Sequence, residues 1–354
     1  MQSRKGIEKS SSGGTKKKRK MPVIVAIVLV ILLGVFSGPV SNILGEKQTQ
    51  ELINQLEGYV SEGLKETENT NGNTEETTKP TIITTNPEGT LEMYVIDVGQ
   101  ADSILFIQGD EVMLVDAGTR GAGDDVAEFL KQKNINEIDI LIGTHPHEDH
   151  MGGMMDILEN FSVECFYFPQ RSDVTTKYYL EILEHVVNNK VPCGSADAAE
   201  IIPFGEASIQ FITSTEPKED KDLNNCSIVI RLTFGEIDFF LGGDIEKEVE
   251  SEILASGLEI ESEIYKASHH GSDTSNTREL VDAVNPDYVY ISCGLYNKYS
   301  HPNQSVIEMF EELKLPVYRT DEVGTISVIT DGKTVTTDKE PGSYISGEEK
   351  NQSK

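Results

Sequence analysis

The sequence predicts an α/β fold in which two facing β-sheets are covered by helices. Between about residues 91 and 337, short apolar runs of strand length alternate with segments whose apolar residues recur at helical spacing. Glycines interrupt the apolar runs where turns are needed, as at Gly109, Gly235 and the pair Gly242-Gly243. Elements of both kinds bury their apolar faces by packing in layers, which favours a sandwich of sheets and helices.

The alternation gives an ordered set of elements and shows no internal repeat. The expected strands are 91–97, 102–107, 111–115, 138–142, 164–168, 207–213, 226–233, 236–241, 262–267, 287–292 and 324–330. The expected helices are 124–134, 150–159, 175–188, 244–255, 277–284 and 303–313. We therefore expect a single large domain over residues 91–337.

The N-terminal region has the features of a membrane anchor. Residues 1–20 contain eight Lys/Arg and one acid, and we interpret them as a basic cytoplasmic tail. Residues 21–44 are uncharged and mostly apolar, and their length suits a single transmembrane helix. Because the lysines precede this span, the remainder of the chain is expected outside the cell membrane. A cleaved signal peptide is the alternative, but Pro39 follows the candidate site at Ser37-Gly38 and opposes cleavage.

The segments on either side of the domain are polar. Residues 45–90 are expected to form a stalk and a disordered linker, with a short amphipathic helix over about 51–64. Residues 338–354 are expected to be a disordered tail, because they have few apolar groups to offset the entropy of ordering. Four widely spaced cysteines form no C-x-x-C pair, and their apolar contexts favour buried free thiols over disulfides.

The densest group of potential metal ligands lies in the run Thr144-His145-Pro146-His147-Glu148-Asp149-His150. The run follows the apolar segment 138–142, and it holds three of the seven histidines of the chain. Alternate residues of an extended segment point the same way, so the first two histidines can reach one ion. Imidazole and carboxylate together suit zinc, manganese or iron. The candidate ligands in this run are His145, His147, Asp149 and His150.

With this run, the chain resembles the metallo-β-lactamase fold hydrolases, and more closely the branch that contains the soluble domain of the competence protein ComEC. The resemblance covers about residues 91–336, and its motifs occur in the family's order. It implies an αββα sandwich. Besides the histidine run, the motifs are Tyr94 to Ser103, Val115-Asp116-Ala117-Gly118, Leu241-Gly242-Gly243-Asp244, Ala267-Ser268-His269-His270-Gly271-Ser272 and Ser300-His301-Pro302.

The resemblance implies one or two Zn²⁺ or Mn²⁺ ions per chain. Asp244 would bridge the two ions and His270 would be the last ligand. One ion would have Asp149, His150, Asp244 and His270, and the other would have His145, His147 and Asp244. Many enzymes of the fold supply a further histidine before the bridging aspartate. Here the segment 222–227 occupies that place, so the second ion is expected to bind more loosely.

The resemblance also implies roles for other residues near the metals. Asp149, His269 and His301 are the expected catalytic residues, with His269 and His301 placed to hold phosphoryl oxygens or to protonate a leaving group. Asn225 and Ser272 are candidates to contact a substrate oxyanion.

The resemblance implies a metal-dependent phosphodiesterase that acts on DNA or on cell-wall phosphocholine, and the N-terminal region places it outside the cell as a membrane-anchored enzyme. The net charge of −30 becomes −37 once the +7 of residues 1–20 is set aside, which opposes general binding of nucleic acid. A local basic patch of Lys266, Arg278 and Lys298 would counter this. A β-lactam, ester or amide hydrolase and a non-catalytic surface binding module remain as alternatives.

Overall fold

The computed structural model describes residues 87–354, apart from 170, 172 and 216–221. The predicted cytoplasmic tail (1–20), anchor (21–44) and nearly all of the linker (45–90), including the helix over 51–64, lie outside the described residues. Within the described part of the chain, no helix has the length and apolar content needed to cross a bilayer.

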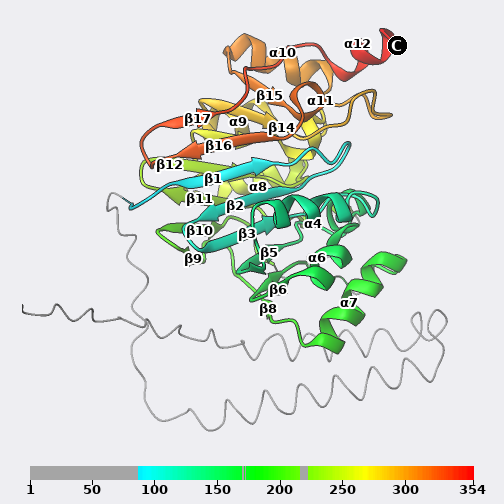
Figure 1. The fold of residues 1–354 in the computed structure, drawn as a ribbon. Helices are drawn as coiled ribbons and strands as arrows, with labels where there is room; N and C mark the ends of the chain where they lie inside the picture. The colour runs from blue at the N-terminus through cyan, green and yellow to red at the C-terminus, as the bar shows by residue number, and fades with distance from the viewer. Residues whose placement is uncertain (1–86, 170, 172, 216–221) are drawn as a thin grey trace, which may run out of the picture.

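Two mixed sheets form the centre of the fold (Figure 1). The first sheet has the order β17 (Val335–Thr337), β16 (Ile326–Thr330), β1 (Leu91–Val95), β2 (Ile104–Gln108), β3 (Glu111–Val115), β5 (Ile140–Ile142), β7 (Phe166–Tyr167) and β8 (Cys193–Gly194). The second has the order β15 (Val317–Arg319), β14 (Tyr288–Ile291), β13 (Ile264–Lys266), β12 (Ile237–Leu241), β11 (Ile230–Phe234), β10 (Ala207–Phe211) and β9 (Ile201–Phe204). A small ribbon pairs β4 (Glu137–Ile138) with β6 (Ser162–Val163).

The strands are apolar on both faces because each sheet is covered on both sides. In β2, Ile104 and Phe106 pack into the core between the sheets, while Leu105 packs on the opposite face. The ring of Phe106 meets that of Phe239 from the second sheet edge to face, with centroids 5.6 Å apart. The interior between the sheets is therefore continuous and buries both inner faces.

Helices cover the two outer faces, which completes four layers. The first sheet packs against α4 (Gly123–Gln132), α6 (Met154–Asn160) and α7 (Lys177–Asn189). The second packs against α8 (Lys247–Ser256), α9 (Arg278–Val284) and α10 (Gln304–Leu313). The short elements are α5 (Glu148–Met151), α11 (Thr320–Val323), α12 (Gly347–Gln352) and the 3₁₀ turns Asn224–Cys226 and Ser268–Gly271. The predicted α/β sandwich is confirmed.

The C-terminal segment 338–354 is not a disordered tail, so this prediction is wrong. It ends in α12, which begins with a capping box between Ser346 and Glu349. Lys350 Nζ lies 2.7 Å from carboxylate oxygens of both Asp321 and Glu322. The backbone N–H of Gly347 donates to the carbonyl of Pro302 at 2.8 Å. Polar contacts hold this segment, and apolar content alone does not reveal them.

Candidate metal centre

The potential ligands gather at the carboxyl ends of strands in both sheets. The strand β5 runs parallel to β3 and leads into the histidine run and α5. In the second sheet, β12 runs parallel to β13 and leads to Asp244, and β13 leads to His270. The carboxyl ends of parallel strands meet at one edge of a sheet, where α/β folds place their binding sites. Residues distant in the sequence thus meet in a single cluster.

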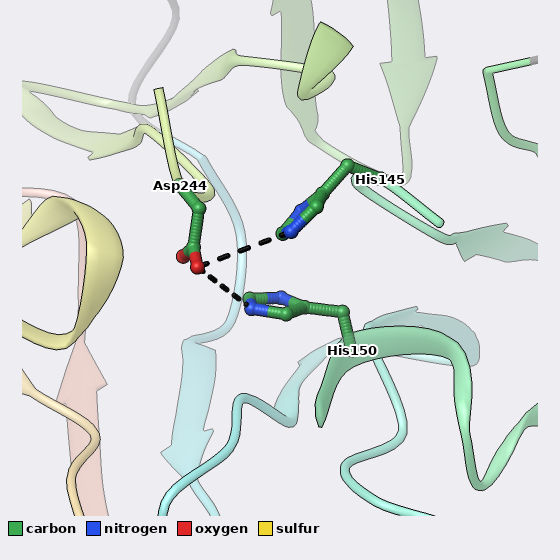
Figure 2. Close-up of side chains that lie close together, drawn as sticks. All are labelled: His145, His150 and Asp244. Carbon is green, nitrogen blue, oxygen red and sulfur yellow. Dashed lines mark ion pairs between the residues drawn. The ribbon is translucent and has the colours of Figure 1, made fainter. Parts of the chain in front are cut away.

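Asp244 faces two neighbouring histidines of the run (Figure 2). Its Oδ2 atom is 3.1 Å from His150 Nε2 and 3.9 Å from His145 Nε2. All three side chains are almost fully buried. Donor atoms of these residues lie within 4.8 Å of one another, a spacing that one ion can bridge.

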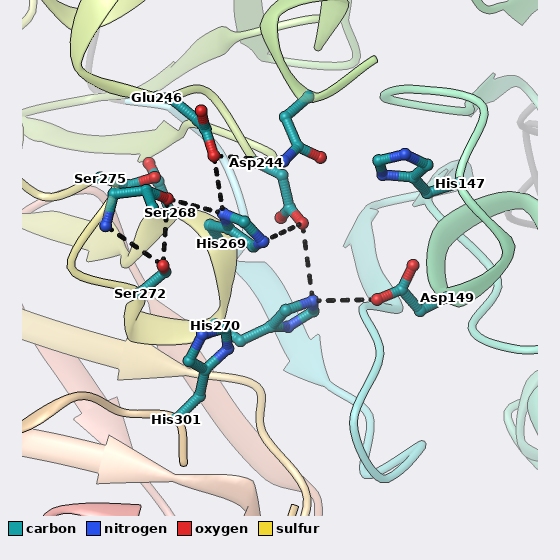
Figure 3. A network of polar contacts seen from close by, with 12 residues as sticks. His147, Asp149, Asp244, Glu246, Ser268, His269, His270, Ser272, Ser275 and His301 are labelled. Atoms are coloured by element: carbon teal, nitrogen blue, oxygen red, sulfur yellow. Dashed lines mark hydrogen bonds and ion pairs between the residues drawn. The ribbon is translucent and has the colours of Figure 1, made fainter. Parts of the chain in front are cut away.

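The same carboxylate also faces His270, which joins Asp149 to the cluster (Figure 3). His270 Nε2 lies 3.6 Å from Asp244 Oδ2 and 3.5 Å from Asp149 Oδ2. His147 completes the set through a contact of 3.0 Å between its Nδ1 and His145 Nε2. The structure therefore brings together all six predicted ligands, with Asp244 shared between two groups.

The residues present fit a divalent metal. His150 Nε2, His270 Nε2 and Asp244 Oδ1 are buried atoms without a hydrogen-bond partner. Leaving several buried polar atoms unpaired is costly, and a metal would satisfy them. Imidazole nitrogens and carboxylate oxygens are the donors that zinc and manganese accept.

A family model of the metallo-beta-lactamase superfamily matches residues 96–294. The chain belongs to this superfamily. Both the fold and the ligand cluster of this metallo-β-lactamase domain lie largely within the matched region.

Among curated proteins, the domain is similar to competence proteins. ComE operon protein 3 of Bacillus subtilis is 29% identical over 255 residues, which cover 66% of this chain and 32% of the relative. Competence protein ComA of Neisseria gonorrhoeae is 25% identical, with 68% of this chain and 32% of the relative covered. Recombination protein 2 of Haemophilus influenzae is 27% identical, with 68% and 29% covered. The predicted resemblance to the ComEC-like branch is confirmed, and the chain spans about a third of the length of these relatives.

Solved structures with related folds include CmlA, a diiron β-hydroxylase from Streptomyces venezuelae. The two sequences are 18% identical, and the match covers 66% of this chain and 53% of CmlA with a TM-score of 0.43. Igni18, a metallo hydrolase from Ignicoccus hospitalis, is 12% identical. The match covers 71% of this chain and 99% of Igni18, with a TM-score of 0.42.

In the metallo-β-lactamase domain, buried acids orient two of the histidines that face Asp244, His150 and His270. The Nδ1 atom of His150 lies 2.7 Å from Asp116 Oδ2, and the same carboxylate accepts hydrogen bonds from Thr144. Asp102, which the sequence does not mark as part of the site, places Oδ1 3.3 Å from His270 Nδ1. Hydrogen bonding at one ring nitrogen fixes which nitrogen is free for a metal.

These charges also set the proton affinities of the histidines. Burial lowers the pKa of His270, but the carboxylates of Asp244 and Asp102 outweigh burial and raise it to about 10. The pKa of His150 rises well above its ordinary value, against burial, because of Asp244 and Asp116. Burial and the charge on His150 hold the pKa of His145 well below its usual range. In the absence of metal, a proton therefore occupies His270 at neutral pH.

His269 and His270, in the turn Ser268–Gly271, both have left-handed backbone conformations. The φ angles are 50° at His269 and 55° at His270, a region that costs energy for residues other than glycine. Asn276 holds the turn: its Oδ1 accepts from the Ser268 N–H, and its Nδ2 donates to the carbonyls of Ser268 and Ser272. Asn276 cannot be predicted from the sequence as a residue that holds this turn, because no local pattern around it indicates such a role.

His269 lies at the entrance to the centre. Its Nε2 atom is 3.8 Å from Asp244 Oδ2, and its side chain is 21% exposed (Figure 3). The Nδ1 atom contacts Thr274 Oγ1 at 3.1 Å. The ring is therefore both oriented by the protein and open to a bound molecule.

His301 stacks on His270, with ring centroids 6.2 Å apart. Burial and the neighbouring charge on His270 lower the pKa of His301 to about 3, so this ring is neutral at physiological pH. The Gly294 N–H donates to Gln100 Oε1, which turns the amide Nε2 of Gln100 toward His301 Nδ1 at 3.3 Å. An amide nitrogen only donates, so the proton of the neutral ring lies on Nε2.

The two predicted substrate contacts bond within the protein. Asn225 Oδ1 accepts from the Glu246 N–H, and Ser272 Oγ contacts Thr274 Oγ1 at 3.0 Å. Both side chains are buried, and their proposed role toward substrate stays a prediction.

The predicted basic patch contains fewer free charges than the sequence indicates. Lys266 is buried and paired with Asp102 at 2.9 Å, and Arg278 pairs with Asp282 on α9 at 2.7 Å. Lys298 is exposed. The four cysteines are buried, as predicted, and none of them forms a disulfide: Cys165, Cys193, Cys226 and Cys293.

Proposed function

We propose that this domain is a metal-dependent phosphodiesterase. The observation that supports the proposal best is the position of Asp244, whose carboxylate lies between two groups of ligands. A carboxylate shared in this way suits a pair of ions, and paired ions suit the in-line displacement of phosphoryl transfer. When bound, such ions supply hydroxide at neutral pH and neutralise charge on the phosphoryl oxygens.

The chain's own residues would bind and orient the diester. His269 and His301 lie side by side, with ring centroids 5.5 Å apart, beside the shared carboxylate. The neutral His301 would donate its Nε2 proton in a hydrogen bond to a phosphoryl or leaving oxygen. His269, with Nδ1 held by Thr274, would direct Nε2 toward the same oxygens. Asp149 would act as a ligand that places the attacking water.

We further propose that residues 21–44 anchor the chain in the cell membrane, with the domain outside the cytoplasm. The competence relatives are consistent with an association with the membrane. Single-stranded DNA and cell-wall phosphocholine are the proposed substrate classes, and Zn²⁺ or Mn²⁺ are the proposed ions.

The test uses the full chain in detergent, loaded with Mn²⁺ or Zn²⁺. Hydrolysis of bis(p-nitrophenyl) phosphate, single-stranded DNA and p-nitrophenyl phosphocholine would be measured for the native chain, Asp149→Ala and Asp244→Ala. Asp273→Ala is the matched control, because Asp273 is an exposed acid close to the 3₁₀ turn Ser268–Gly271, which carries His270. We expect losses of at least about a hundredfold in the two ligand variants and little change in the control.

Two results would contradict the proposal. Stoichiometric metal without cleavage of any diester would favour an ester or amide hydrolase. A chain that binds no metal would favour a non-catalytic binding module.

A further inference from the structure

The loop between β14 and α10 exposes an unusual amount of apolar surface. In the described part of the chain, five large hydrophobic side chains are exposed, and three of them lie in this loop. They are Leu295, Tyr296 and Tyr299, with exposed fractions of 52%, 42% and 51%. Exposed apolar groups that cluster beside a functional site indicate a binding surface.

The loop is held firmly, so its exposed rings occupy defined positions. Asn297 Nδ2 donates to the carbonyls of Gly294 and His301, and Asn297 Oδ1 accepts from the His301 N–H. Asn351 of α12 donates to the Asn297 carbonyl at 2.9 Å. Fixed aromatic rings bind flat partners at a low cost in entropy.

A row of stacked rings leads from the metal centre to the surface of this loop. His301 stacks on the ligand His270 at 6.2 Å, and Tyr299 stacks on His301 at 5.6 Å, each pair with an interplanar angle of 25°. A planar group that extended this row would lie beside the phosphoryl group of a bound diester. The row thus suits the base of a nucleotide that carries the diester.

The charges near the exposed tyrosines favour a base over a choline group as the ligand of this loop. Lys298 Nζ lies 4.6 Å from the ring centre of Tyr299, and Lys354 Nζ lies 5.1 Å from that of Tyr296. These ammonium groups oppose a cationic choline at either ring. They are well placed for the phosphates of a polyanion, because each can move from a ring to a phosphate oxygen.

We propose that Tyr299 and Lys298 form a subsite of the metal centre that binds single-stranded nucleic acid. Tyr299 stacks a base next to the scissile phosphate, and Lys298 pairs with a neighbouring phosphate. The proposal rests on the proposed phosphodiesterase function and narrows its substrate class to nucleic acid with unpaired bases. Stacking tolerates any base, so the subsite confers preference for single strands without sequence specificity.

The test compares two labelled oligonucleotides of equal length with phosphorothioate links, which slow cleavage. One carries thymine bases and the other is abasic, so both have the same charge. Binding to the full chain is measured by fluorescence anisotropy at low salt, in Mn²⁺ and again in EDTA. In Mn²⁺, we expect the native chain to bind the thymine strand at least about fivefold more tightly than the abasic strand.

Variants of the chain locate the effect. Tyr299→Leu removes the difference between the strands, whereas Tyr299→Phe retains it. Lys298→Ala weakens both strands equally. Ile329→Ala is the matched control, since Ile329 is an exposed apolar residue of β16 outside the loop, and it leaves both affinities unchanged.

Equal affinity for the two strands in the native chain, or no binding of either, would overturn the subsite. So would a difference that survives in Tyr299→Leu, or a loss of p-nitrophenyl phosphocholine hydrolysis alone in that variant. Base-dependent binding without any cleavage would contradict only the phosphodiesterase function. Diester cleavage with base-independent binding would contradict only the subsite.

Discussion

At the scale of single residues, two of the metal-facing histidines, His150 and His270, depend on an acid behind the ring. Asp116 contacts His150, and Asp102 contacts both His270 and the buried Lys266. Two negative groups behind the histidines keep the free ring nitrogens directed at Asp244. The same acids raise the proton affinity of the rings, so proton and metal compete for the same nitrogen atoms.

This competition predicts a pH dependence of metal binding. Because the metal-free protein raises the pKa of His270 to about 10, a metal displaces a proton from this ring at any pH below that value. Affinity for Mn²⁺ should therefore increase from pH 6 to pH 9, by about tenfold per pH unit for each proton displaced. Calorimetry in buffers of different ionisation enthalpy measures the proton release directly.

The control for this measurement is His301→Gln. The pKa of His301 is about 3, so the ring is already neutral and its removal should leave the proton release unchanged. His270→Gln should reduce both affinity and proton release. Metal affinity that is independent of pH would show that the histidines are neutral before the metal binds.

The contact between Gln100 and His301 predicts that the neutral amide of Gln100 sets the tautomer of His301. In Gln100→Glu, the carboxylate can still accept from the Gly294 N–H, but it favours a proton on His301 Nδ1 instead of Nε2. Diester hydrolysis should fall by at least about tenfold. The ¹⁵N chemical shifts of His301 report the tautomer, and Gln132→Glu, an exposed change on α4, is the control. Unaltered shifts and rates would contradict this assignment.

At the scale of elements, α12 supports the loop that carries His301. Its first residue, Gly347, packs so closely that a Cβ atom would lie 2.4 Å from the carbonyl oxygen of His301. The helix also contacts Asn297 and Ser300 through Asn351. Hydrogen bonds thus join the loop to α12, which lies beside α10 (Figure 1).

This packing predicts that Gly347→Ala displaces α12 from the loop. Diester hydrolysis should fall by about tenfold or more, because a small shift of a positioned group is costly to catalysis. The circular dichroism spectrum should change little, since a short peripheral helix is affected. Glu348→Ala, an exposed neighbour in the same helix, should behave as the native chain. Equal activity in both variants would show that α12 has no part in positioning His301.

At the scale of the whole molecule, the net charge of −30 opposes the compact state. Raising NaCl from 20 to 200 mM should therefore raise the melting temperature of the metal-free chain, because salt screens the repulsion. Added Mn²⁺ should raise the melting temperature further, because an ion at a hundred times its Kd adds about 2.7 kcal/mol to the free energy of unfolding. Differential scanning calorimetry measures both effects. Asp244→Ala should keep the response to salt and lose the response to metal.

The sequence predicts the sandwich and the ligands better than the contacts that support them. Four of the six ligands lie within the histidine run, so their spacing identifies them, whereas Asp244 and His270 are identified by the resemblance of their motifs. Asp102 and Lys266 are 164 residues apart, and no pattern along the chain joins them. Strands such as β8 and β15 are two or three residues long, too short for a periodic signal, and they form because neighbouring strands offer hydrogen bonds.

The division of the ligands between the two sheets sets the order in which the protein can mature. A growing chain that has reached residue 200 holds His145, His147, Asp149 and His150, but it lacks Asp244 and His270. A chain that ends before β12 lacks the shared carboxylate, and one that ends before β13 lacks the last imidazole. Metal loading is therefore a late event, and a truncated product cannot retain the ion tightly.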